Sequence, residues 1–144
     1  MKEIRLVGDD IGREELEAAP GAWVSGFLQR PRKVLLLPPD FTRGYSQAGL
    51  IVQVLYQMLA PEAQVDIMPA LGTHVPVSCD ERLEMFGPDI PEERFLVHNW
   101  RTDVVKIGEV PASYVAEVSE GLVDYTIDVE VNRRLLDPSY DLIV

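Results

Sequence analysis

The chain has 144 residues, enough for one domain with a sizeable core, and its 47% hydrophobic and 26% charged residues are typical of a soluble globular protein. With 13 Lys and Arg against 24 Asp and Glu, the net charge is −11, which argues against a nucleic-acid partner because no basic patch is available to neutralise phosphates. This charge does not exclude a small anionic substrate, since one well-placed arginine is enough to bind a carboxylate.

The sequence carries no sign of export or of membrane insertion. Cys79 is the only cysteine, which excludes an internal disulfide and a cysteine metal cluster. No apolar run approaches the roughly 18 residues of a membrane span, and the N-terminus lacks the apolar core of a signal peptide. We therefore expect a cytoplasmic protein with no membrane partner.

The first thirty residues predict a short strand followed by two helical segments. Ile4–Val7 has the apolar content of a strand. A Glu-rich helix is expected over Ile11–Ala19, and Pro20-Gly21 should end it. Residues 22–29 are expected to add one or two further helical turns before Pro31.

The middle of the chain predicts a strand–helix–strand unit. Lys33–Leu37 is a compact apolar strand, and Pro38-Pro39 should end it because proline cannot extend a ladder. Ser46 is the expected N-cap of a helix running to Leu59, and Val65–Ala70 is the next strand. The apolar face of that helix is expected to consist of Leu50, Ile51, Val54, Leu55, Met58 and Leu59. We predict that the two strands are parallel neighbours.

Shorter elements are expected further along the chain. Ser78 and Glu81 have the spacing of a capping box in front of a short helix that Gly87-Pro88 ends. Strand candidates follow at residues 95–98, 104–107 and 125–131, and Asp141–Val144 begins a buried strand.

These elements together predict the fold class. We expect residues 1–144 to form a single α/β domain, a Rossmann-like open sheet that is mostly parallel and has helices packed on it. Because the domain ends inside a core strand, it looks like the N-terminal part of a larger protein. An exposed strand edge at Asp141–Val144 would also favour self-association.

Polar side chains follow the two strands of the central unit. The first loop presents Asp40, Thr42 and Arg43, and the second presents Thr73 and His74. Because parallel strands place such loops at the same sheet edge, we expect Asp40, Arg43 and His74 to open onto one cleft. Arg43 can bind a carboxylate with two parallel hydrogen bonds, and an imidazole can both take and give a proton near neutral pH.

Each of these residues also has a simpler interpretation. Asp40 and Arg43 could form a local ion pair, or Asp40 could cap the following helix. In a functional role, Asp40 could instead accept hydrogen bonds from a ligand or orient a histidine. His98, flanked by Val97 and Trp100, is interpreted as a half-buried structural residue. No metal ligand is assigned, because the two histidines have no ligand spacing, and the glycine-rich nucleotide signatures are absent.

Several segments together resemble the N-terminal domain of the nickel-pincer lactate racemase family. The matching motifs, in chain order, are Pro38-Pro-Asp-Phe-Thr-Arg43, Gly72-Thr-His74, His98-Asn-Trp100 with Asp103 and Ile107-Gly108, Val131-Asn-Arg133, and Tyr140-Asp-Leu-Ile-Val144. The resemblance runs from about Lys33 to the last residue, and the Asp-x-Thr-Arg and Gly-Thr-His motifs carry most of it.

This resemblance implies a 2-hydroxyacid racemase or epimerase that works by hydride transfer with a nickel-bound pyridinium-dithio mononucleotide. It implies that His74, Asp40 and Arg43 are catalytic, and that Asp40, Thr42, Arg43 and Thr73 lie beside the cofactor. The family's second catalytic histidine, its cofactor-bearing lysine and its nickel-ligating histidine have no matching motif here. The chain alone is therefore expected to bind no cofactor and to be inactive.

Two other classes of function compete with the racemase. The chain could be a non-catalytic α/β domain in which Arg43 captures a small anionic metabolite. It could instead be an assembly module whose sheet edge pairs with another subunit.

Overall fold

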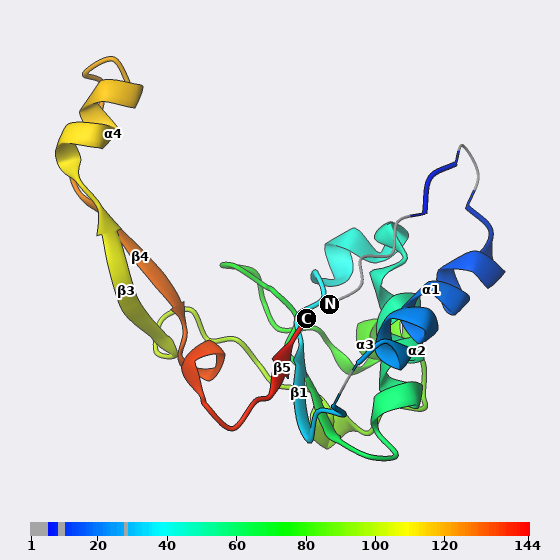
Figure 1. Cartoon of the computed structure of the whole chain (residues 1–144). Helices are drawn as coiled ribbons and strands as arrows, with labels where there is room; N and C mark the ends of the chain where they lie inside the picture. The colour runs from blue at the N-terminus through cyan, green and yellow to red at the C-terminus, as the bar shows by residue number, and fades with distance from the viewer. Residues whose placement is uncertain (1–5, 9–10, 28) are drawn as a thin grey trace. The chain divides into compact units, whose positions relative to one another are not determined.

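The computed structural model describes residues 6–8, 11–27 and 29–144, which form two compact units. One unit contains the residues up to His98 together with Pro138–Val144, and the other is Asn99–Asp137 (Figure 1). The strand predicted at Ile4–Val7 lies mostly outside the described residues, and Leu6 and Val7 belong to no regular element. None of the described helices is long and apolar enough to cross a bilayer.

The first unit is built on a parallel sheet of three strands in the order β2-β1-β5. These strands are β1 (Lys33–Leu36), β2 (Gln64–Ile67) and β5 (Leu142–Ile143). β1 pairs in parallel with both of the others, so the prediction that the strands near residues 34 and 65 are parallel neighbours is confirmed. The Rossmann-like α/β fold class is confirmed with it. β5 lies at one edge of this sheet, and self-association through that edge stays a prediction.

The β1–β2 pairing continues beyond the ends of both strands. The amide of Met68 donates to the carbonyl of Leu36, and the amide of Ala70 donates to that of Pro38. A parallel bridge then joins Pro39 to Ala70. Strand β1 ends before the two prolines, as expected. Single contacts continue past its end because a proline lacks the N–H donor but keeps a carbonyl that accepts.

The connection from β1 to β2 passes through a 3₁₀ segment, η1 (Phe41–Ser46), and helix α2 (Ala48–Leu59). The N-cap of α2 is Gln47 in a left-handed conformation, not Ser46 as predicted. Ser46 still contributes as an acceptor, since its Oγ receives a hydrogen bond from the amide of Ala48 at 3.3 Å. The 3₁₀ turn occupies Ser46, so the α-helix begins one residue later than the serine pattern predicts.

The buried face of α2 is also rotated from the predicted one. Leu55 and Leu59 are buried as expected, whereas Gly49 and Val52 are buried in addition. Ile51 and Met58 are half-buried at the edge of the core. The reason is a close approach to the next helix, α3 (Cys79–Phe86), since a Cβ on Gly49 would lie only 2.1 Å from the carbonyl oxygen of Met85.

Helix α1 (Arg13–Ser25) is one continuous helix with Pro20 inside it. The prediction that Pro20-Gly21 separates two helical segments was therefore wrong. Val24 is completely buried and Trp23 packs against the same core, so apolar burial beyond the proline offsets the lost backbone hydrogen bond. The capping box of α3 is confirmed, since the amide of Glu81 donates to Ser78 Oγ and the Glu81 carboxylate accepts from the Ser78 amide.

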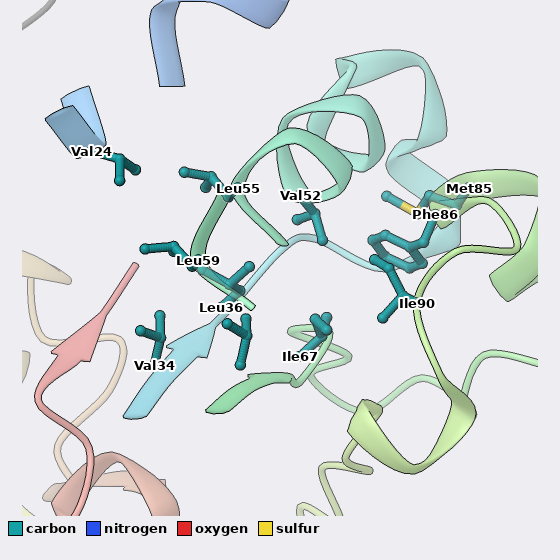
Figure 2. Packing of buried hydrophobic residues seen from close by; sticks show 11 residues of the cluster. Val24, Val34, Leu36, Val52, Leu55, Leu59, Ile67, Met85, Phe86 and Ile90 are labelled. Carbon is teal, nitrogen blue, oxygen red and sulfur yellow. The ribbon is translucent and has the colours of Figure 1, made fainter. Parts of the chain in front are cut away.

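The main core lies between the sheet and helices α1, α2 and α3. Alternate strand residues Val34, Leu36 and Ile67 face it, as strand periodicity requires. Figure 2 shows these side chains packed against those of the helices. The cluster of buried residues consists of Val24, Val34, Leu36, Val52, Leu55, Leu59, Val65, Ile67, Met85, Phe86 and Ile90.

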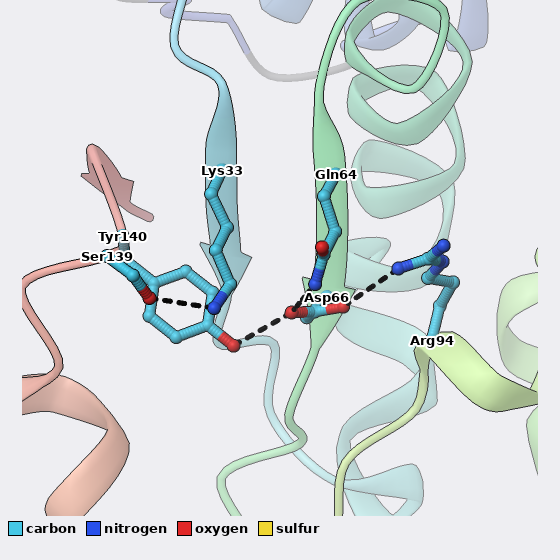
Figure 3. A network of polar contacts seen from close by, with 6 residues as sticks. All are labelled: Lys33, Gln64, Asp66, Arg94, Ser139 and Tyr140. Atoms are coloured by element: carbon cyan, nitrogen blue, oxygen red, sulfur yellow. Dashed lines mark hydrogen bonds and ion pairs between the residues drawn. The ribbon is translucent and has the colours of Figure 1, made fainter.

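A smaller cluster covers the other face of the sheet, where Leu35, Met68 and Tyr140 are buried. Asp66 of β2 lies on this face, only 5% exposed. Its carboxylate accepts hydrogen bonds from the Tyr140 hydroxyl at 2.8 Å and from Gln64 Nε2 at 2.9 Å, and pairs with Arg94 at 3.5 Å (Figure 3). These partners replace the water that the buried carboxylate loses.

The second unit is an antiparallel pair, β3 (Val104–Val110) with β4 (Ile127–Asn132), and a short helix α4 (Ala112–Val118). The two strand candidates near residues 104 and 125 are thus confirmed as elements, and α4 was not predicted. The candidate strand at residues 95–98 was wrong, because that segment makes only a single bridge, between Phe95 and Ile67.

Candidate functional site

The two polar loops begin at matched points of the sheet. The parallel bridge between Pro39 and Ala70 is the last pairing between the two strand segments, and both segments leave the sheet immediately after it. Asp40 is thus the first residue of one loop, and Leu71 is the first of the other. This register explains how Asp40 and His74, 34 positions apart in the sequence, come into contact.

A tight turn then aims His74 back toward the first loop. The His74 amide donates to the Leu71 carbonyl at 3.0 Å, which closes the turn. Gly72 has φ +57° inside it, a conformation that a residue with a Cβ rarely adopts. The glycine of the Gly-Thr-His motif therefore has a structural reason in this turn.

Asp40 and His74 are in direct contact. His74 Nδ1 lies within hydrogen-bond distance of Asp40 Oδ2, and Thr42 Oγ1 donates to the other carboxylate oxygen, Oδ1, at 2.5 Å. Asp40 is only 7% exposed, whereas the side chain of His74 is 57% exposed. A buried carboxylate thus holds a histidine whose other side faces solvent.

The contact fixes the tautomer of the neutral imidazole. An ionised carboxylate can only accept hydrogen bonds, so Nδ1 of His74 must carry the proton that it shares with Asp40. Nε2 is then the basic nitrogen and lies away from the carboxylate. This is the arrangement in which an aspartate orients a histidine for proton transfer.

The hydrogen bonds also hold Asp40 in its ionised form. The bond from the Thr42 hydroxyl has the largest effect and that from His74 the next, and both lower the pKa of Asp40 below its usual 3.8. Burial opposes them, because removing the carboxylate from water disfavours its charge. The carboxylate is therefore an anion at neutral pH and can stabilise a protonated imidazole.

Arg43 joins the group through Thr42. Its Nη1 donates to Thr42 Oγ1 at 3.2 Å, and its guanidinium is exposed. Among the described residues, the ion-pair partner of Asp40 is His74 and not Arg43. Asp40 precedes the 3₁₀ segment, but its side chain makes no capping hydrogen bond there. Neither simpler interpretation of the Asp40–Arg43 pair, a local ion pair or a helix cap, describes the observed contacts.

Thr73 and His98, the other two residues singled out in the sequence, lie in separate segments. Thr73 is exposed in the turn next to His74. His98 is half-buried in the segment after Phe95. Within residues 6–8, 11–27 and 29–144 there is no group of three or more His, Cys, Asp or Glu side chains able to hold a metal ion. The described residues therefore offer an acid–base pair and an exposed guanidinium, but no nickel ligand set.

Sequence reasoning did not anticipate the link between Asp40 and Thr42. The signal was present, because a hydroxyl two residues after an aspartate is well placed to reach its carboxylate within one turn. The family resemblance implies only that Thr42 lies beside the cofactor.

Comparison with known structures gives two matches of interest. A crystal structure of a protein from Thermotoga maritima matches with a TM-score of 0.81 and 27% identity, over 96% of this chain and 34% of that one. The lactate racemase apoprotein from Thermoanaerobacterium thermosaccharolyticum matches with a TM-score of 0.58 and 20% identity, over 89% of this chain and 30% of that one. At 20% identity, the similarity to the lactate racemase apoprotein shows a shared fold and nothing further. The chain thus spans about a third of the length of each.

Comparison with sequences identifies the family. No curated protein matches the chain. Residues 21–136 match the model of the lactate racemase N-terminal domain, a range that includes both polar loops. The chain therefore belongs to the lactate racemase N-terminal domain family.

Proposed function

We propose that this domain is the N-terminal part of a racemase or epimerase of lactate or a related 2-hydroxyacid, and that His74 is one of its acid–base groups. The observation that carries the proposal is the contact of exposed His74 with buried, ionised Asp40. A histidine held in this way has one nitrogen fixed by its partner and the other directed to a substrate.

The chemistry of a 2-hydroxyacid matches these groups. In this proposal, Nε2 of His74 removes the proton of the substrate alcohol, and the resulting imidazolium is stabilised by the Asp40 carboxylate. Arg43 binds the substrate carboxylate, because its planar guanidinium can donate two parallel hydrogen bonds to two oxygens. On the reverse step, His74 returns the proton to the alkoxide oxygen.

The family also implies a nickel-pincer mononucleotide, which would supply the hydride acceptor. The described residues do not fit a nickel site, since they contain no cluster of potential metal ligands. In our proposal the metal is therefore held by the rest of the racemase polypeptide. The exposed loop residues Thr42, Arg43 and Thr73, with Asp40, border the nucleotide.

The proposal is tested by measuring interconversion of D- and L-lactate with the cofactor supplied. The intact racemase that carries this domain should interconvert the two enantiomers, and the 144-residue chain should not. Arg43→Lys in the intact protein should raise KM, since an ammonium cannot form the two parallel bonds. Binding of 2-hydroxyacids without any interconversion by the intact protein would contradict the proposal and favour a metabolite-binding domain.

A further inference from the structure

Thr42 is the only side chain in the two loops that contacts both Asp40 and Arg43 in the described part of the chain. Its Oγ1 lies 2.5 Å from Asp40 Oδ1 and 3.2 Å from Arg43 Nη1. A hydroxyl has a single hydrogen, and here that hydrogen is donated to the carboxylate. Toward Arg43 the hydroxyl can therefore only accept, which matches a guanidinium that can only donate.

The direction of every hydrogen bond in this group is consequently fixed. Arg43 donates to Thr42, Thr42 donates to Asp40, and His74 donates to the second oxygen of Asp40. Donation by a cation polarises the hydroxyl and strengthens the bond that the hydroxyl makes in turn. The proposed anion-binding group and the proposed acid–base group are thus connected through one hydroxyl.

We propose that Thr42 is a positioning residue: its hydroxyl couples the guanidinium of Arg43 to the Asp40–His74 pair and keeps both in the orientation that the reaction needs. This inference rests on the proposed function of His74 and Arg43. This role is separate from contact with a cofactor, because the Thr42 hydroxyl is already hydrogen-bonded to Asp40 and Arg43.

A purely structural role of the hydroxyl would have different consequences. Thr42 is exposed, so replacing its hydroxyl by the methyl group of valine leaves no buried cavity. Thr42→Val should therefore fold normally and change only the hydrogen bonds. The charged groups that act on Asp40 are His74, Arg43 through Thr42, and the carboxylate of Glu81, and the substitution changes none of these charges.

The test uses nuclear magnetic resonance on the 144-residue chain, with no cofactor or substrate. The Asp40 carboxyl carbon is titrated, and the ring nitrogens of His74 are recorded at increasing pH until their signals stop changing, so that the neutral imidazole is observed. In Thr42→Val the pKa of Asp40 should rise, because the hydrogen bond that lowers this pKa most is gone. The population of the Nδ1–H tautomer of His74 should fall, and Thr42→Ser should restore both signals.

Thr102 provides a matched control. Its hydroxyl donates to the neighbouring Asp103 at 3.2 Å, a hydroxyl–carboxylate bond that involves neither Asp40 nor His74. Thr102→Val should leave Asp40 and His74 unchanged. If Thr42→Val behaves like Thr102→Val, or if serine does not restore the wild-type signals, the coupling role of Thr42 is refuted.

Activity separates this inference from the proposed function. In the intact racemase, Thr42→Val should lower kcat roughly tenfold, the loss expected for one hydrogen bond to a charged group, and Thr42→Ser should stay within about twofold. Thr42→Val could alter the Asp40 and His74 signals while turnover proves independent of both residues. That result would support the coupling and refute the proposed function. Unaltered signals would refute the coupling whatever the activity.

Discussion

Helices α2 and α3 are in close contact at Gly49, and Gly49→Ala should destabilise the protein. An added Cβ would lie 2.1 Å from the carbonyl oxygen of Met85, whereas ordinary van der Waals contact begins at 3.4 Å. The obstacle is backbone, so one of the helices must move. Overpacking costs about 1–3 kcal/mol, here at the upper end, and the better helix propensity of alanine returns about 1 kcal/mol. We expect a net loss of about 2 kcal/mol in the free energy of unfolding.

The assay is denaturation by guanidinium chloride, followed by tryptophan fluorescence, to which Trp23, packed against the core, and Trp100 both contribute. Gly44→Ala is the matched control, because no atom lies within 4 Å of its added Cβ, and it should change stability by less than about 0.5 kcal/mol. If Gly49→Ala is as stable as Gly44→Ala, then α2 and α3 are not packed as the structure has them. The rotation of the buried face of α2 would then need another cause.

Two further predictions concern the buried carboxylates. The pKa of Asp40 is lowered in the folded protein, so its ionised form contributes stability above its usual 3.8 and this contribution is lost as the pH falls through the folded-state value. The stability difference between wild type and Asp40→Asn should therefore shrink as the pH falls below 3.8, and a difference that keeps growing below that pH would contradict this sign. Tyr140→Phe removes the hydroxyl that donates to Asp66 and should cost about 1.5–3 kcal/mol in urea denaturation, whereas exposed Tyr45→Phe should cost nothing measurable.

Hydrophobic periodicity and capping motifs predicted an element correctly where the local sequence pattern and the tertiary packing agree. The apolar runs near Val34 and Val65 predicted adjacent parallel strands, and the spacing of Ser78 and Glu81 predicted the start of α3. Where packing decides, local rules failed. Helix α1 continues through Pro20 because Val24 is buried beyond it.

The same distinction holds for the candidate site. The sequence placed Asp40, Arg43 and His74 at one sheet edge, which followed from strand order alone. Which side chains are paired depends on the strand register and on the turn at Gly72, and neither is visible in spacing along the chain. The sequence left two alternatives open for Asp40, an ion pair with Arg43 or the orientation of a histidine, and the matched ends of β1 and β2 bring Asp40 to His74.

The two histidines of the chain allow the central claim to be tested in one experiment. In the intact racemase, supplied with its cofactor, turnover of lactate is compared between His74→Ala and His98→Ala. Loss of an acid–base group lowers turnover by at least about a hundredfold, so we expect this loss for His74→Ala. His98→Ala should keep its turnover and lose only stability, as expected for a half-buried structural residue. Full turnover without His74 would contradict the account.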